Sequence, residues 1–156
     1  MRGPHGSIVG WTAGGSGPTF GPMVIPHLVL GLALASDPAC TVKQAARAET
    51  EASTLKSWAE IYRSYDRFQH CDDGAIAEGY SAAVGNMFSQ RWGDIDKLGE
   101  LVDKHEDFKS FVLHHVDETI SAEVLETIAH NAKHACPNAL IMLCAEISIT
   151  VSEVPK

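Results

Sequence analysis

Bulky apolar residues after residue 50 recur at steps of three and four positions, which is the period of one face of an α-helix. A first helix is predicted over about 53–70 and a second over about 73–91. The first stripe consists of Leu55, Trp58, Ile61, Tyr62, Tyr65 and Phe68, and the second of Ile76, Tyr80, Val84, Met87 and Phe88. Gly79 and Gly85 each cost a helix about 1 kcal/mol relative to alanine, so we expect a neighbouring backbone to approach the second helix closely.

Shorter segments with the same period follow the second helix. Trp92-Gly93 is predicted to end that helix, Asp94 to cap a third, Ser121 to cap a fifth and Pro137 to end the fifth. The fourth helix is marked by Phe108, Phe111, Val112 and His115, and the last by Leu140, Leu143, Cys144 and Ile147. Alternation at Ile147, Ile149 and Val151 indicates a tail that is extended. The sequence therefore predicts an all-α fold, an irregular bundle of five to six helices with short connections.

The segment before residue 36 has a different character. An apolar run from Met23 to Ala35 closes on Ala33-Leu34-Ala35, the small-residue pattern that a signal peptidase recognises. Residues 1–35 are therefore predicted to be a leader, either cleaved or disordered, and residues 36–156 a single helical domain. Alternatively, the glycine-rich residues 1–22 precede a true start at Met23. The apolar run is shorter than the roughly 20 residues that span a bilayer, so we expect no stable membrane insertion.

The chain is acidic, with a formal net charge of −8. Arg2 is the only charged residue before Ser36, so residues 36–156 hold 20 acids against 11 bases, a balance of −9. Such a field repels nucleic acid and anionic membranes and favours a cationic partner. We therefore expect a protein partner and no nucleic-acid binding.

All four cysteines, Cys40, Cys71, Cys136 and Cys144, follow the leader. An even number of cysteines after an export signal predicts disulfides and a periplasmic or secreted location. A helical hairpin at Pro137 would place Cys144 about 7 to 9 Å beyond Cys136, farther than the usual 4.4 to 6.8 Å. We therefore expect Cys71 to pair with Cys136 or Cys144, and Cys40 with the remaining thiol. Buried free thiols at Cys71 and Cys144 are the alternative.

The sequence contains few candidates for catalytic or metal-binding residues. Asp72-Asp73-Gly74 with Glu78 is the densest acidic group, but its spacing does not match a calcium loop, so Asp72 or Asp73 is predicted to cap the second helix. His130 and His134 stand four apart after Glu126, but the zinc-protease pattern HExxH and a third ligand are absent. No Gly-x-Ser-x-Gly motif occurs. We assign no catalytic residue and expect no metal or cofactor.

The block Ser64-Tyr65-Asp66-Arg67-Phe68-Gln69-His70-Cys71-Asp72-Asp73-Gly74-Ala75-Ile76-Ala77-Glu78-Gly79-Tyr80-Ser81, followed by Cys136-Pro137 and Leu143-Cys144, resembles a group of small exported proteobacterial helical proteins. This resemblance implies no particular activity for the chain. In size, helical content and cysteines the chain is also similar to periplasmic immunity proteins that neutralise type VI secretion amidases.

The leading hypothesis is an exported acidic binding protein that occludes a partner protein, with an inhibitor or immunity protein as its more specific form. Its predicted acidic rim consists of Asp103, Glu106 and Asp107, and its predicted binding loop of His114, His115, Asp117, Glu118 and Thr119. The alternatives are a small periplasmic hydrolase that uses Asp73, Glu78 or the histidines, and a structural or stress-related protein.

Overall fold

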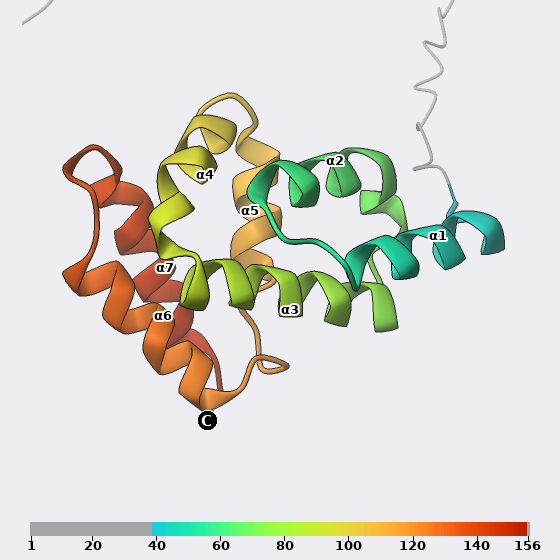
Figure 1. The fold of residues 1–156 in the computed structure, drawn as a ribbon. Coiled ribbons are helices and arrows are strands. Elements are labelled where there is room, and N and C mark those ends of the chain that lie inside the picture. Colours follow the sequence, from blue (N-terminus) through green and yellow to red (C-terminus); the bar gives the residue numbers. More distant parts are fainter. Residues whose placement is uncertain (1–38, 156) are drawn as a thin grey trace, which may run out of the picture. The chain divides into compact units, whose positions relative to one another are not determined.

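The computed structural model describes residues 39–155, so the predicted leader and its cleavage site lie outside the described residues. Within them the chain is all α-helical, as predicted, and contains no β-strand (Figure 1). The α-helices are α1 (Val42–Ala52), α2 (Trp58–Phe68), α3 (Gly74–Gln90), α4 (Ile95–Val102), α5 (Glu106–His114), α6 (Ala122–His134) and α7 (Ile141–Glu153). Three short 3-10 helices, η1 (Gln69–Cys71), η2 (Trp92–Asp94) and η3 (Asn138–Leu140), lie between them.

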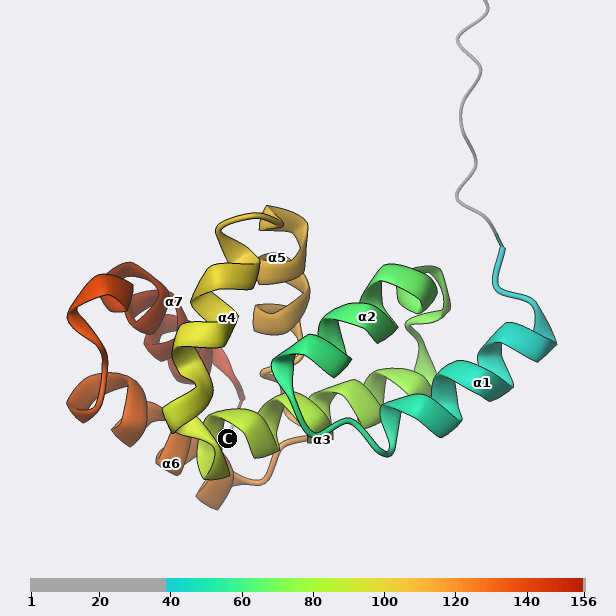
Figure 2. The same ribbon diagram turned by 45° about the horizontal axis from the view of Figure 1, so that its top comes forward.

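Helix α3 is the central element of the fold. It packs against α1, α2 and α6, and Figure 2 shows α1 running beside it. The largest fully buried side chains include Trp58, Tyr80, Phe88 and Phe108. The rings of Trp58 and Phe88 lie 4.9 Å apart between centroids, which joins α2 to α3. Most of the aromatic-rich stripe predicted on the first helix, and the bulky stripe predicted on the second, thus lie in the core.

Gly79 is the point of closest approach between α3 and α1. A Cβ atom built at Gly79 would lie 2.8 Å from the Cβ of Ala52. At Gly85 the corresponding neighbour is the Cδ1 atom of Ile120, at 3.2 Å. The expected close approach of a neighbouring backbone is confirmed at Gly79, whereas at Gly85 the close neighbour is the Ile120 side chain.

Two helix boundaries differ from the prediction. Helix α1, which Thr41 begins with a capping box, lies before the first predicted helix and was not expected. The first predicted helix, over about 53–70, corresponds to α2, which starts only at Trp58 because Ser57 accepts a hydrogen bond from Glu60 N. At the other end, α7 continues to Glu153 where an extended tail was expected. Alternating Ile147, Ile149 and Val151 are compatible with a helix because Ile147 is buried while Ile149 faces solvent.

The disulfide pairing expected from spacing is wrong. Cys40 pairs with Cys71, and Cys136 pairs with Cys144. The expectation placed Cys144 well along a helix that returns directly from Pro137. Because η3 intervenes and α7 starts only at Ile141, Cys144 lies on the first turn of α7, with its Cα atom 6.2 Å from that of Cys136.

Both disulfides are consistent with the environment expected for an exported protein. None of the four cysteines is free, and such bonds persist in oxidising compartments. No single helix of residues 39–155 is both long enough and apolar enough to cross a bilayer. Helix α6 and the segment Asn138–Glu153 are long and apolar enough only when they are taken together, and the chain bends by 111° between them.

Candidate functional site

A buried polar network holds the α5–α6 connection against α3. His115, at the end of α5, is 1% exposed, and Ser81, on α3, is 0% exposed. The Nδ1 atom of His115 lies 3.1 Å from Ser81 Oγ, and its Nε2 atom lies 3.0 Å from Asp72 Oδ2. Ser81 Oγ also donates a hydrogen bond of 2.6 Å to Asp117 Oδ2. The network therefore joins the start of α3, its middle and the connection that leads to α6.

The hydroxyl group of Ser81 sets the direction of the hydrogen bonds in this network. The single hydroxyl hydrogen of Ser81 goes to the Asp117 carboxylate, so Ser81 Oγ is left to accept a hydrogen bond from His115 Nδ1. Asp72 Oδ2 accepts one from Nε2.

Asp117 is fixed in the network as a carboxylate. Its burial raises the pKa of the carboxyl group, but hydrogen bonds from Ser81 and Thr119 outweigh this effect, so the pKa lies below its ordinary value. Thr119 donates from its backbone N–H over 2.8 Å and from its hydroxyl group. Asp117 thus stabilises the turn that follows α5.

Ser81, His115 and Asp72 stand in the order of a serine-hydrolase triad, but Ser81 is not placed to act as a nucleophile. In such a triad the serine hydroxyl donates to the histidine and is open to substrate. Here the hydroxyl donates to Asp117, and the residue has no exposed surface. The network is therefore a structural clamp.

An open hollow of about 440 Å³ lies between α3 and the start of α6, and Ser81 is at its edge although its side chain has no exposed surface. Glu78 and Asn86 line one wall, and Thr119 and Ser121 line the other. The three acidic residues of the group predicted at 72–78 have separate roles in the structure. Asp73 caps α3 by accepting from Gly74 N over 2.8 Å, Asp72 binds His115, and Glu78 faces solvent at the hollow.

The predicted binding loop is only partly available to a partner. His114, Glu118 and Thr119 are exposed. His115 is buried and Asp117 is half-buried, and both side chains are engaged in the clamp. His115 is therefore not a surface contact, which corrects the expectation for this residue. Its place on the inward face of the fourth predicted helix already indicated burial.

The predicted acidic rim lies beside an apolar surface that the sequence did not single out. Asp103, Glu106 and Asp107 are exposed at the α4–α5 corner. A groove of about 300 Å³ runs between this corner and α7, and Asp103, Glu106, Lys109, Met142 and Glu146 line it. Lys109 and Glu146 form an ion pair of 3.2 Å across the groove. We call this groove and the exposed residues of α7 the α5–α7 surface.

Helix α7 supplies the apolar part of the α5–α7 surface. Met142 is 74% exposed, Ile141 59% and Ile149 57%. With Ala145, which is also exposed, they lie at the spacing of one helix face. Glu146 and Glu153 are the only charged residues of α7. A large apolar stripe of this kind on an exposed helix is typical of a contact surface.

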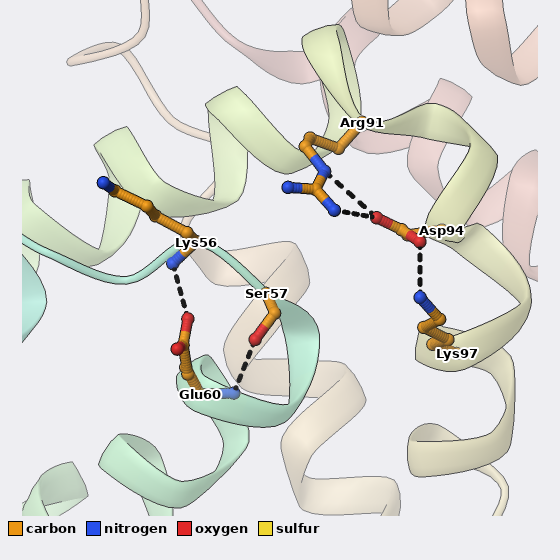
Figure 3. A network of polar contacts seen from close by, with 6 residues as sticks. All are labelled: Lys56, Ser57, Glu60, Arg91, Asp94 and Lys97. Carbon is orange, nitrogen blue, oxygen red and sulfur yellow. Dashed lines mark hydrogen bonds and ion pairs between the residues drawn. The ribbon is translucent and has the colours of Figure 1, made fainter.

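Two smaller groups of polar contacts lie at the start of α2 and at the start of α4 (Figure 3). Asp94 was expected to cap α4, but its side chain makes no capping bond and instead accepts from Lys97 and Arg91 over 2.6 and 2.7 Å. The hydrogen bond from Lys97, then that from Arg91, lowers the pKa of Asp94. The backbone N–H of Lys56 lowers the pKa of Glu60 in the same way, over 2.9 Å.

Within residues 39–155, no group of three or more histidine, cysteine, aspartate or glutamate side chains is arranged to hold a metal ion. Comparison of the chain with protein-family models, with curated proteins and with solved structures gave no match.

Proposed function

We propose that the protein is a periplasmic binding protein that captures a protein partner through the α5–α7 surface. The partner presents an apolar patch bordered by lysine or arginine. The observation that carries this proposal is the position of Met142 beside the carboxylates of Asp103 and Glu106. Apolar anchors surrounded by a polar rim are the usual anatomy of protein interfaces.

Charge supports a cationic partner at this surface. Among residues 39–155, no ion pair engages Asp103, Glu106 or Asp107, so their charge is available to steer a basic protein. In the groove itself, Lys109 offsets the charge of Glu146 only. The net charge of −8 extends this field over the whole chain, which raises the rate of association with a cation.

The rigidity of the fold supports an inhibitor or immunity protein in particular. The disulfide from Cys136 to Cys144 braces the start of α7, and the clamp around His115 holds the end of α5. A surface fixed before binding loses little conformational entropy when the partner docks. The resemblance to exported immunity proteins is in keeping with this role. The hydrolase alternative is less well supported, because Ser81 is buried.

The test is capture of partners from a periplasmic extract on the immobilised protein, with identification by mass spectrometry. The Asp103→Lys/Glu106→Lys variant should retain at least tenfold less of the specific partner. The matched control is Glu49→Lys/Asp66→Lys, which changes the net charge equally at exposed positions of α1 and α2 and should retain it fully. Equal capture by both variants would rule out this surface.

The Met142→Ser variant tests the apolar contribution to partner binding separately from the contribution of charge. Because Met142 is 74% exposed, its replacement should leave the melting temperature unchanged and weaken capture severalfold. Unchanged capture by this variant would contradict the assignment of Met142 as the anchor.

A further inference from the structure

His130 and His134 form an exposed pair on α6, one helical turn apart. Their ring centroids lie 4.7 Å apart, with the ring planes tilted by 41°. The hydrogen bonds and ion pairs of residues 39–155 engage neither ring, whereas His115 and His105 each contact a partner. Both rings are therefore free to bind a ligand from solvent.

The distance between the two rings matches that of a metal chelate. A metal ion about 2.0–2.1 Å from one nitrogen of each ring lies about 3.2 Å from each ring centroid. An angle of roughly 90–110° at the metal then places the two centroids about 4.5 to 5.2 Å apart. The observed 4.7 Å falls within this range. The spacing of the two residues along the helix therefore holds the rings at a distance that a chelate can use.

The position of the pair on α6 also favours a cation. His134 lies in the last turn of a 13-residue helix, where unpaired carbonyl groups carry partial negative charge. Glu126, one turn before His130, is exposed and adds negative charge to the same face of the helix. The four cysteines form disulfides and do not compete for the metal.

We propose that His130 and His134 chelate one divalent transition-metal ion of the nickel, copper and zinc group, for which imidazole is a preferred ligand. Two side chains hold the ion, and water fills its remaining positions. This agrees with the finding that residues 39–155 contain no cluster of three or more ligands. The proposal is independent of the α5–α7 surface.

The experiment is calorimetric titration of the untagged full chain with Cu²⁺ and, separately, with Zn²⁺. Wild type should bind one Cu²⁺ ion per chain, more tightly than Zn²⁺, as the general order of divalent-metal affinities predicts. His130→Asn and His134→Asn should each weaken binding at least tenfold. The matched control His114→Asn removes an exposed histidine outside the pair and should bind as wild type does.

A second measurement identifies the ligands directly. Substoichiometric Cu²⁺ should broaden the ring resonances of His130 and His134 in the nuclear magnetic resonance spectrum before those of any other histidine. The variants should keep the melting temperature of the metal-free wild type, because both side chains are exposed. The proposal is overturned if wild type binds neither ion, if His114→Asn weakens binding as much as His134→Asn, or if another histidine broadens first.

Discussion

His115 Nε2 lies 3.0 Å from Asp72 Oδ2, although the two residues are 43 positions apart in the chain. The imidazole is almost fully buried, and the Asp72 side chain is 16% exposed. This contact fastens the end of α5 to the segment before α3. It also lies next to Cys71, whose disulfide joins the same segment to the start of α1. The clamp and a disulfide therefore meet at one corner of the fold.

Replacing Asp72 should destabilise the protein. Asp72→Ala leaves a buried donor of His115 without an acceptor, so the free energy of unfolding should fall by about 2 to 3 kcal/mol. The control is the neighbouring Asp73→Asn, which keeps a good helix cap and should cost about 0.5 kcal/mol or less. Urea denaturation measures both variants, and similar losses for the two would contradict the role of the clamp.

Acid should weaken the clamp through Asp117. Its pKa in the folded protein is lowered, whereas an unfolded aspartate titrates near about 3.9. The ionised carboxylate therefore contributes stability above about pH 4, and this contribution is lost as the pH falls through the lowered folded pKa. Urea denaturation from pH 6 to pH 2.5 should show wild type more stable than Asp117→Asn at pH 6. The difference should shrink below about pH 4, and a gap that widens in acid would contradict this assignment.

Ser81 should not react with an alkyl fluorophosphonate, a reagent for activated serine nucleophiles. The hydroxyl group of Ser81 is buried and donates to Asp117. Intact mass spectrometry of the treated full chain should show no adduct. An adduct that maps to Ser81 and disappears in Ser81→Ala would show that the network is catalytic.

The two disulfides should contribute unequally to stability. Cys40 and Cys71 are 31 residues apart, and Cys136 and Cys144 are 8 apart. In the chain-entropy model, the longer loop contributes about 3–4 kcal/mol and the shorter about 2–3 kcal/mol. Paired cysteine-to-serine variants under urea denaturation measure this difference. Peptide mapping without reduction tests the connectivity, and any peptide that links Cys71 to Cys136 or Cys144 would refute it.

The sequence predicted the elements that depend on local signals. Ser121 caps α6, and Asp73 caps α3 by accepting a hydrogen bond from Gly74 N. The bulky residues of α3 recur with the period of a helix, and they are buried as this period predicts. Helix α1 was missed because its buried residues are Ala48 and Ala52, which produce no bulky apolar stripe.

Contacts between distant residues could not be predicted in the same way. The hydrogen bonds of the clamp join residues 34 to 43 positions apart, and no spacing rule joins Ser81 or Asp72 to His115. The acidic rim was evident from composition, but the exposure of Met142 was not. Apolar residues occur around most of the circumference of α7, so its sequence period does not reveal which face is buried.

The most direct test of the proposed function is the oxidation of methionine in the free and partner-bound protein. In the free protein, hydrogen peroxide should oxidise Met142, which is 74% exposed, much faster than Met87, which is 2% exposed. Saturation with the captured partner should slow the oxidation of Met142 at least fivefold and leave that of Met87 unchanged. If Met142 is oxidised at the same rate in the complex, the partner does not bind at the α5–α7 surface.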